Sequence, residues 1–352
     1  MNKRSFAIVT AVLTFTAGIA IARLSLPNLF NKPAPSPINK EIQLSNYRLS
    51  GPYQFERLSI FLVHGPDANS HLYTPLQEAM ERKLVVVHET GDVNELAIEN
   101  VSDTEEVFVQ AGDIVKGGKQ DRVLSVDVIL PAKSGRLPIS AFCVESSRWS
   151  QRGAESGDHF TLTEMAATYS LKRAIKEDPS QARVWDEVKS SQAKVATAMN
   201  YDARSELSPS SLPLTLENDV VQQAVEPYIK NLSSIVDRSN DVIGFAFAID
   251  DDLKSADVYA SNAMFKRLWP RLLKAAAVEA IAEETKTSND SLAIENVGAF
   301  LVETEKGAET VSEVTPRTHS AKRETEKGLF FETRDMHHDA AWIHRSYLTR
   351  GQ

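Results

Sequence analysis

Residues 107–149 read VFVQAGDIVKGGKQDRVLSVDVILPAKSGRLPISAFCVESSRW, and this stretch decides the fold that we expect. Apolar runs of β type lie on either side of a polar turn at 113–122, and a third apolar run ends at Glu145. Short apolar runs separated by turns rich in glycine, proline, aspartate and asparagine are typical of strands that pair antiparallel. The stretch therefore predicts a β-rich body that begins near Ile42.

The pattern predicts the following elements around this stretch. Strands are expected at 58–63, 84–87, 96–98, 107–109, 123–130 and 137–144, with a short helix at 76–80. Beyond the loop after Trp149, Thr161 and Glu164 match a capping box, in which a hydroxyl and a carboxylate satisfy the first backbone N–H groups of a helix. We therefore expect a helix from there to Glu177. Two more helices are expected at 181–199 and at 221–235, the second kinked or broken at Pro227.

The C-terminal third alternates between strand and helix signals. The pattern predicts a hairpin at 242–259, a helix at 264–282, a strand at 298–303 and an exposed loop or hairpin arm at 304–328. We expect residues 329–348 to dock on the body. The fold class is thus α+β, a mixed or antiparallel sheet body with a helical segment and a C-terminal hairpin-plus-helix unit. We expect one domain over 42–350, with parts at 42–149, 160–236 and 242–350, because a lone hairpin needs a partner face.

The N-terminal segment has the features of a targeting sequence. Within residues 1–26, Lys3 and Arg4 precede an uncharged run that ends in the small pair Ala20 and Ala22. This pattern predicts a cleaved signal peptide or a single membrane anchor, with the rest of the chain exported. Residues 27–41 hold four prolines and read as an extended linker.

The overall composition excludes some classes of protein. The chain has 352 residues, 42% of them hydrophobic and 25% charged, which is ordinary for a globular protein with a sizeable core. The formal net charge of −9 argues against a nucleic-acid binder, which would carry a basic surface. The one cysteine, Cys143, lies in an apolar run, so a buried thiol is favoured over a nucleophile.

The turn at 113–122 is the first candidate site. A glycine pair permits positive φ and brings backbone N–H groups close to a ligand, and the neighbouring basic groups and an indole would hold an anion. The predicted ligand-binding residues are Lys116, Gly117, Gly118, Lys119, Gln120, Arg122, Arg148 and Trp149. A tight turn with solvated lysines would use the same residues, and this alternative stays open. The nucleotide-binding patterns GxxxxGK[ST] and GxGxxG are absent from the sequence.

Three carboxylates near this turn are weak catalytic candidates. Asp113, Asp121 and Glu145 could act as acid–base groups if two of them converged on a pocket. The histidines suggest no metal site, because His337, His338 and His344 do not have the usual zinc spacing, and His64 and His71 read as loop residues. We expect neither a metal nor a cofactor.

Two segments resemble a known prokaryotic family. The stretch GGKQDR at 117–122 with CVESSRW at 143–149, and the run GFAFAIDDDLKSADVYASNAMFKRLWPRLL at 244–273, are similar to the ARG and rhodanese-phosphatase-superfamily-associated domain. The likeness covers residues 47 to about 284. The family name records an association with ADP-ribosylglycohydrolases and rhodanese-like phosphatases, which implies a link to nucleotide- or phosphate-bearing ligands. The resemblance supplies no catalytic residues.

These observations lead to three alternative functions. The first is an exported ligand-binding or interaction module whose anion-binding cleft takes an anionic small molecule or another protein. The second is a hydrolase acting on a phosphate, ADP-ribose-like or glycosidic substrate, and the third is a purely structural domain. No nucleic-acid partner is expected, and membrane contact is expected only through the N-terminal segment. The sequence leaves the oligomeric state open.

Overall fold

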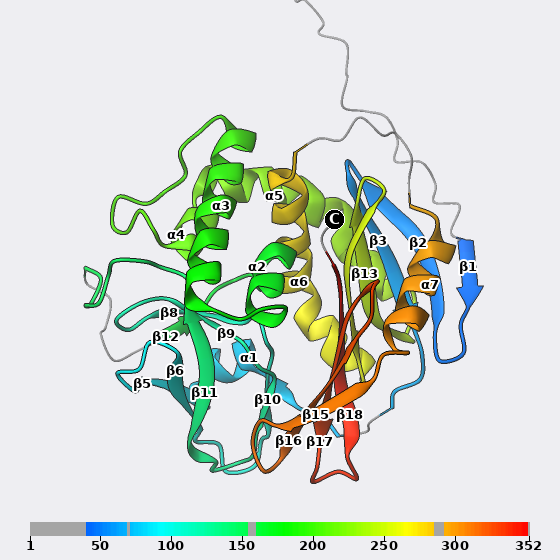
Figure 1. Cartoon of the computed structure of the whole chain (residues 1–352), viewed down its shortest axis with the longest axis horizontal. Coiled ribbons are helices and arrows are strands. Elements are labelled where there is room, and N and C mark those ends of the chain that lie inside the picture. The colour runs from blue at the N-terminus through cyan, green and yellow to red at the C-terminus, as the bar shows by residue number, and fades with distance from the viewer. Residues whose placement is uncertain (1–39, 69–70, 154–159, 285–291, 351–352) are drawn as a thin grey trace, which may run out of the picture. The chain divides into compact units, whose positions relative to one another are not determined.

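A nine-stranded antiparallel sheet dominates the computed structural model, which describes residues 40–68, 71–153, 160–284 and 292–350. Its strands come from the beginning, the middle and the end of the described chain (Figure 1). From one edge to the other they are β1 (Lys40–Gln43), β2 (Arg48–Phe55), β3 (Leu58–His64), β13 (Val242–Ile249), β14 (Asp252–Tyr259), β18 (Ala341–Thr349), β17 (Gly328–Asp335), β16 (Thr318–Glu324) and β15 (Glu309–Glu313).

Two smaller sheets and the helices complete an α+β fold, as the sequence predicts. The six-stranded sheet contains β12 (Phe160–Leu162), β8 (Ile114–Gly117), β9 (Arg122–Leu124), β11 (Gly135–Cys143), β6 (Glu95–Asn100) and β5 (Val85–Glu89). The three-stranded sheet contains β10 (Val128–Leu130), β7 (Val107–Val109) and β4 (Thr74–Pro75). The helices are α1 (Leu76–Glu81), α2 (Tyr169–Lys176), α3 (Gln181–Met199), α4 (Leu212–Leu216), α5 (Asp219–Leu232), the 3₁₀ helix η1 (Ser233–Arg238), α6 (Asn262–Ala282) and α7 (Ile294–Thr304).

Strand β3 is covered on both faces of the large sheet. Its side chains alternate between two apolar clusters: Ile60 and Leu62 pack with α5 and α6, whereas Phe61 and Val63 pack with α7. Because neither face meets water, the strand is a continuous apolar run without polar alternation. Burial on both faces explains why β3 appears in the sequence as an uninterrupted apolar run.

The stretch 107–149 forms most of the two smaller sheets and their own apolar core. Val115, Leu124, Val128 and Ile139 are all buried in one cluster there. Other side chains of the same stretch, such as Phe108, pack instead into the large helical core. The β-rich part therefore shares a core with the rest of the fold.

The single strand expected at 123–130 is wrong, because the chain changes sheets within it. β9 pairs with β11 and β8, whereas β10 pairs with β7. Between them Asp127 is buried, and its carboxylate accepts the backbone N–H of Ala111 at 2.7 Å. A buried carboxylate needs such partners, so this polar residue marks the point where the strand breaks.

The capping box expected at Thr161 and Glu164 is also wrong. Residues 160–162 form β12, which pairs with β8, and Glu164 is an exposed partner of Lys274. Helix α2 begins later, after Thr168, whose hydroxyl accepts the backbone N–H of Leu171. The capping-box pattern is misleading here because pairing with β8 provides the hydrogen bonds that the backbone N–H groups would otherwise obtain from a helix cap.

Three predictions in the other segments are corrected as well. Residues 298–303 belong to helix α7, because Val297, Phe300 and Leu301 recur at helical spacing and reach the sheet. The Ser/Pro-rich segment 207–214 reads as a loop in the sequence, but its last three residues begin helix α4 at 212–216. His337 and His344, which would share one face if this segment were helical, lie instead on the β17–β18 hairpin.

The N-terminal predictions fall largely outside the described residues, because the description begins at Lys40. There β1 pairs with β2, so the last two residues of the expected linker belong to a strand. The described residues lie in one compact unit, Pro37–Gln352. Within the described ranges, no helix has both the length and the apolar character that crossing a membrane requires.

Candidate functional site

The register of β2 and β3 brings polar side chains to one face of the large sheet. Arg48 lies opposite His64, and Ser50 lies opposite Leu62. Residues that pair directly in an antiparallel ladder share a face, and so do residues two apart on one strand. Ser50 and His64 are therefore diagonal neighbours, close enough for their side chains to meet.

Ser50, His64 and Asp241 form a continuous chain of hydrogen bonds. Ser50 Oγ lies 2.7 Å from His64 Nε2, and His64 Nδ1 lies 2.8 Å from Asp241 Oδ1. Because an ionised carboxylate only accepts hydrogen bonds, Nδ1 carries the proton and the Nε2 lone pair faces the serine hydroxyl. This is the order of a nucleophile, a base and a group that orients the base.

Asp241 is held as an anion by its surroundings. Burial favours the neutral acid, but hydrogen bonds from Ser239, His64 and Arg48 outweigh it and hold the pKa of Asp241 well below its ordinary value. Arg48 donates to the second carboxylate oxygen at 2.8 Å. The aspartate thus stays charged at neutral pH and fixes the ring of His64.

This chain of side chains borders a cavity with a volume of about 300 Å³. Besides the serine and the histidine, the lining includes Tyr53, Arg48 and Arg238. Tyr53 Oη lies 3.4 Å from Ser50 Oγ, and the Arg238 guanidinium lies over the Tyr53 ring at 5.2 Å from its centroid. Apart from that ring, Arg238 has no hydrogen-bond or ion-pair partner among the described residues, so its charge is available to an anion.

The arrangement can activate a hydroxyl beside a cationic wall. His64 can take the proton of Ser50 when the oxygen attacks, and Asp241 stabilises the resulting imidazolium. Tyr53 and Arg238 line the same cavity and are donors that can stabilise a developing negative charge. Ser50 is 2% exposed, so a substrate must reach it through the cavity.

The residues predicted at the 113–122 turn lie together, and several of them are already bound by other groups of the protein. Gly117 and Gly118 both have positive φ, and the N–H of Lys119 donates to Glu89 at 2.6 Å. The Lys116 ammonium pairs with Glu217 at 2.5 Å. The turn is thus fixed largely by internal contacts.

Trp149 lies at this turn, as the predicted cleft requires. The residue is 43% exposed, and Lys119 Nζ and the Arg122 guanidinium carbon lie 5.2 Å and 5.5 Å from the centroid of its ring. Arg122 is fully buried, and its Nε and Nη2 have no hydrogen-bond partner among the described residues. Gln120 is also buried, and within the same described part of the chain its side-chain oxygen has no hydrogen-bond partner. Arg122 Nη2 also lies 3.8 Å from Glu89 Oε2, an ion pair that balances part of its charge.

The three candidate carboxylates are engaged by arginines. Asp121 accepts hydrogen bonds from Arg152 at 2.8 Å and 3.2 Å, and Glu145 is gripped by Arg148 at 2.7 Å and 2.6 Å. The third, Asp113, accepts a hydrogen bond from Arg271 of α6 at 2.5 Å. The acid–base role of these carboxylates stays a prediction, and ion pairing gives it no support.

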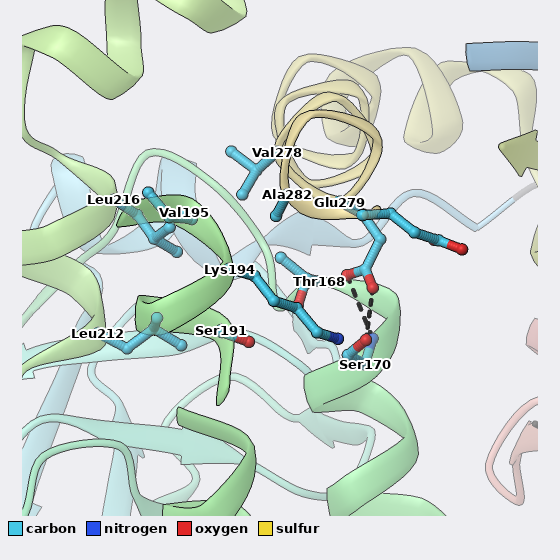
Figure 2. A pocket seen from close by; sticks show the side chains of 11 residues that line it. Thr168, Ser170, Ser191, Lys194, Val195, Leu212, Leu216, Val278, Glu279 and Ala282 are labelled. Carbon is cyan, nitrogen blue, oxygen red and sulfur yellow. Dashed lines mark hydrogen bonds between the residues drawn. The ribbon is translucent and has the colours of Figure 1, made fainter. Parts of the chain in front are cut away.

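A further cavity, between α2, α3 and α6, has no room for a substrate. Figure 2 shows Glu279 of α6 facing Ser170 at the start of α2, to which it is hydrogen bonded, with Lys194 of α3 beside them. The volume is about 20 Å³, which is enough for roughly one water molecule.

Sequence reasoning missed the serine–histidine–aspartate chain. It placed His64 in a turn, whereas the residue ends β3 and is 4% exposed. The one available signal was a histidine at the end of an apolar run, opposite a strand that carries a serine. Asp241 gave no signal, because it lies 177 residues further along the chain.

Comparison with known proteins identifies a family but no individual relative. Neither the curated proteins nor the solved structures gave a match. A family model matches residues 46–348, so the likeness extends beyond the expected end near residue 284 and reaches β18. The chain therefore belongs to the family of the ARG and Rhodanese-Phosphatase-superfamily-associated Protein domain.

Proposed function

We propose that this protein is a serine hydrolase that cleaves small anionic esters. Ser50 is the nucleophile, His64 the general base and acid, and Asp241 the group that orients the histidine. The observation that carries the proposal is the unbroken hydrogen-bond chain of these three side chains at the wall of a cavity of about 300 Å³.

The reaction follows from the positions of the protons. Ser50 Oγ attacks the ester carbonyl carbon while its proton passes to His64 Nε2, which then protonates the leaving alkoxide. Water enters, gives a proton to His64 and attacks the acyl-serine. The carboxylic acid leaves, and the proton returns to Ser50 Oγ. Asp241 stays ionised throughout, in keeping with its lowered pKa.

The cationic wall of the cavity supports an anionic substrate. Arg238 has a charge that no described carboxylate neutralises, and Arg48 already binds Asp241 and Glu41. We therefore assign substrate recognition to Arg238 and support of the aspartate to Arg48. The phosphatase association in the family's description is in keeping with an anionic ligand.

In this proposal the protein is exported and acts outside the cytoplasm. It rests on the basic start, the uncharged run and the small pair of residues 1–26. Cell fractionation of a C-terminally tagged full-length chain tests it, because recovery in the cytoplasm alone would contradict export.

The test of the reaction is labelling with a fluorophosphonate probe. The wild-type protein should react, with the adduct on the peptide that contains Ser50, and the variants Ser50→Ala and His64→Gln should not. Ser59→Ala is the matched control, because Ser59 is a buried serine of the neighbouring strand outside the hydrogen-bond chain. If the wild type stays unlabelled, or Ser50→Ala still reacts, the proposal is wrong.

Substrate charge is tested with two p-nitrophenyl esters, the acetate and the hemisuccinate. Arg238→Gln should lower kcat/KM for the anionic ester by roughly ten- to a hundredfold and leave the neutral ester nearly unchanged, since one charged hydrogen bond contributes about 1.5–3 kcal/mol. Trp149→Ala tests the second candidate, a binding module at the 113–122 turn, which is favoured by the Arg122 nitrogens that have no hydrogen-bond partner among the described residues. Loss of phosphate binding in Trp149→Ala, with no esterase activity in any variant, would favour that module.

A further inference from the structure

Three residues from distant parts of the chain place potential metal-binding atoms together. His71 precedes β4, Glu106 precedes β7, and His338 lies in the turn between β17 and β18. One ligand atom of each residue lies within 4.8 Å of the other two. The sequence predicted no metal here, because spacing along the chain cannot reveal a site built from three separate segments.

The distances are close to those of a bound divalent cation. His71 Nε2 lies 2.6 Å from Glu106 Oε2, and His338 Nε2 lies 3.7 Å from the same oxygen. A tetrahedral zinc ion with bonds of about 2.0–2.1 Å separates its ligand atoms by about 3.3 Å. Shifts of about half an ångström in these atoms, together with a rotation of the two stacked rings, would therefore make them a ligand set.

The two imidazoles are already arranged with their Nε2 atoms toward the carboxylate. The rings of His71 and His338 stack with centroids 4.5 Å apart, and Tyr73 packs edge-on against His71 at 4.7 Å. His338 Nε2 is buried, and among the described residues it has no hydrogen-bond partner. A buried ring nitrogen without such a partner is unusual unless another ligand takes its lone pair.

We infer that His71, Glu106 and His338 bind a divalent transition metal ion, of which Zn²⁺ fits the donor set best. Two imidazole nitrogens and one carboxylate oxygen are ligands that zinc accepts with a fourth position open to solvent. The site lies apart from the Ser50 cavity in residues and lining, so the inference does not depend on the proposed hydrolase activity.

The surrounding charges allow a cation despite a nearby arginine. Arg317 donates to both oxygens of Glu106 and to Asp335, and Asp335 is fully buried. Two carboxylates and one guanidinium leave a net charge of −1 when the histidines are neutral, which favours a dication. Arg317 orients the Glu106 carboxylate from outside the ligand set. Each oxygen of that carboxylate keeps a second lone pair, which is available to the ion.

The ion would connect the small sheets to the large one. His71 and Glu106 flank the β4 and β7 strands of the three-stranded sheet, whereas His338 caps a hairpin of the nine-stranded sheet. Because binding a folded state raises stability by mass action, the metal would add resistance to unfolding. Its role here is to join these segments.

The test uses purified full-length protein stripped with a chelator and then titrated with Zn²⁺ by calorimetry. The wild type should bind one equivalent and melt at a higher temperature with the metal. His338→Ala and His71→Ala should each weaken binding by more than about tenfold. His337→Ala is the matched control, because this exposed neighbour lies in the same turn outside the ligand set.

Each outcome decides the inference. Binding of Co²⁺ with the intense visible absorption of a four-coordinate site, lost in His338→Ala and kept in His337→Ala, supports it. Wild-type protein that binds no Zn²⁺ after the chelator is removed overturns it. So does a folded His338→Ala variant, checked by circular dichroism, that binds as tightly as the wild type.

Discussion

At the scale of single residues, His344 is held between two buried carboxylates. Its Nδ1 lies 2.8 Å from Asp127 and its Nε2 lies 3.1 Å from Asp257, with the ring stacked on Tyr259 at 4.6 Å. Burial disfavours the charged ring, but the two aspartates outweigh burial and raise the pKa of His344. In turn, although burial opposes ionisation, His344 lowers the pKa of Asp127 to about 2.

These opposite shifts predict how stability depends on pH. A raised histidine pKa contributes stability that is complete below about pH 6.5 and is lost as pH rises through the folded-state value. The lowered pKa of Asp127 contributes stability above about pH 4 that is lost as pH falls toward about 2. Urea unfolding should therefore show stability falling above pH 6.5, by at most about 1.4 kcal/mol per pH unit.

The variant His344→Gln removes the titrating group and should flatten this alkaline slope while lowering stability throughout. His337→Gln, at an exposed position, should keep the wild-type slope. An unchanged slope in His344→Gln would assign the pH dependence to other groups.

At the scale of elements, the β8–β9 turn depends on a glycine. Gly118 has φ +53°, and a Cβ placed on it would lie 2.3 Å from the Phe160 ring and 2.5 Å from Glu89. Gly118→Ala therefore combines backbone strain with a clash and should destabilise by about 2–4 kcal/mol. Gly91→Ala is the control for strain alone, because Gly91 has φ +89° with nothing within 4 Å. If the two variants lose the same free energy of unfolding in urea, the turn relaxes around the added methyl group and the clash prediction is wrong.

The elements that the sequence predicted well have local signals. Helix α3 has the bounds 181–199 that the sequence predicts, because Val184, Val188 and Val195 recur at helical spacing on one buried face. The strand predicted at 298–303 is wrong because this segment covers only part of α7 and is too short to show the helical spacing of its apolar residues. Where the chain leaves one sheet for another, as at Asp127, no local sequence pattern indicates which strand it pairs with next.

At the scale of the whole molecule, side chains tie the β-rich part to the helices and the large sheet. Arg271 of α6 reaches Asp113, Tyr259 donates to Gln110 at 3.0 Å, and Phe108 packs in the helical core. The candidate site likewise joins β2 and β3 to a residue near β13. Such contacts between distant segments could not be predicted from sequence, because no local pattern encodes them.

This sharing of a core predicts that the described fold unfolds as one unit. Hydrogen exchange with increasing urea should expose β11 and β14 at the same midpoint, since neither keeps its packing without the other part. The coincidence of tryptophan fluorescence and circular dichroism provides a second measurement. Loss of β11 protection at clearly lower urea would show that the β-rich part opens independently.

The single thiol of the chain can report how often the fold opens locally. Cys143 lies at the end of β11, fully buried, with its backbone N–H and carbonyl both bound by the side chain of Gln181 of α3. The sulfur itself lies 3.6 Å from the Val93 carbonyl oxygen, so a maleimide cannot reach it until the structure around the end of β11 opens. The rate of alkylation therefore measures how often the fold opens around this strand end, and no reporter group has to be introduced.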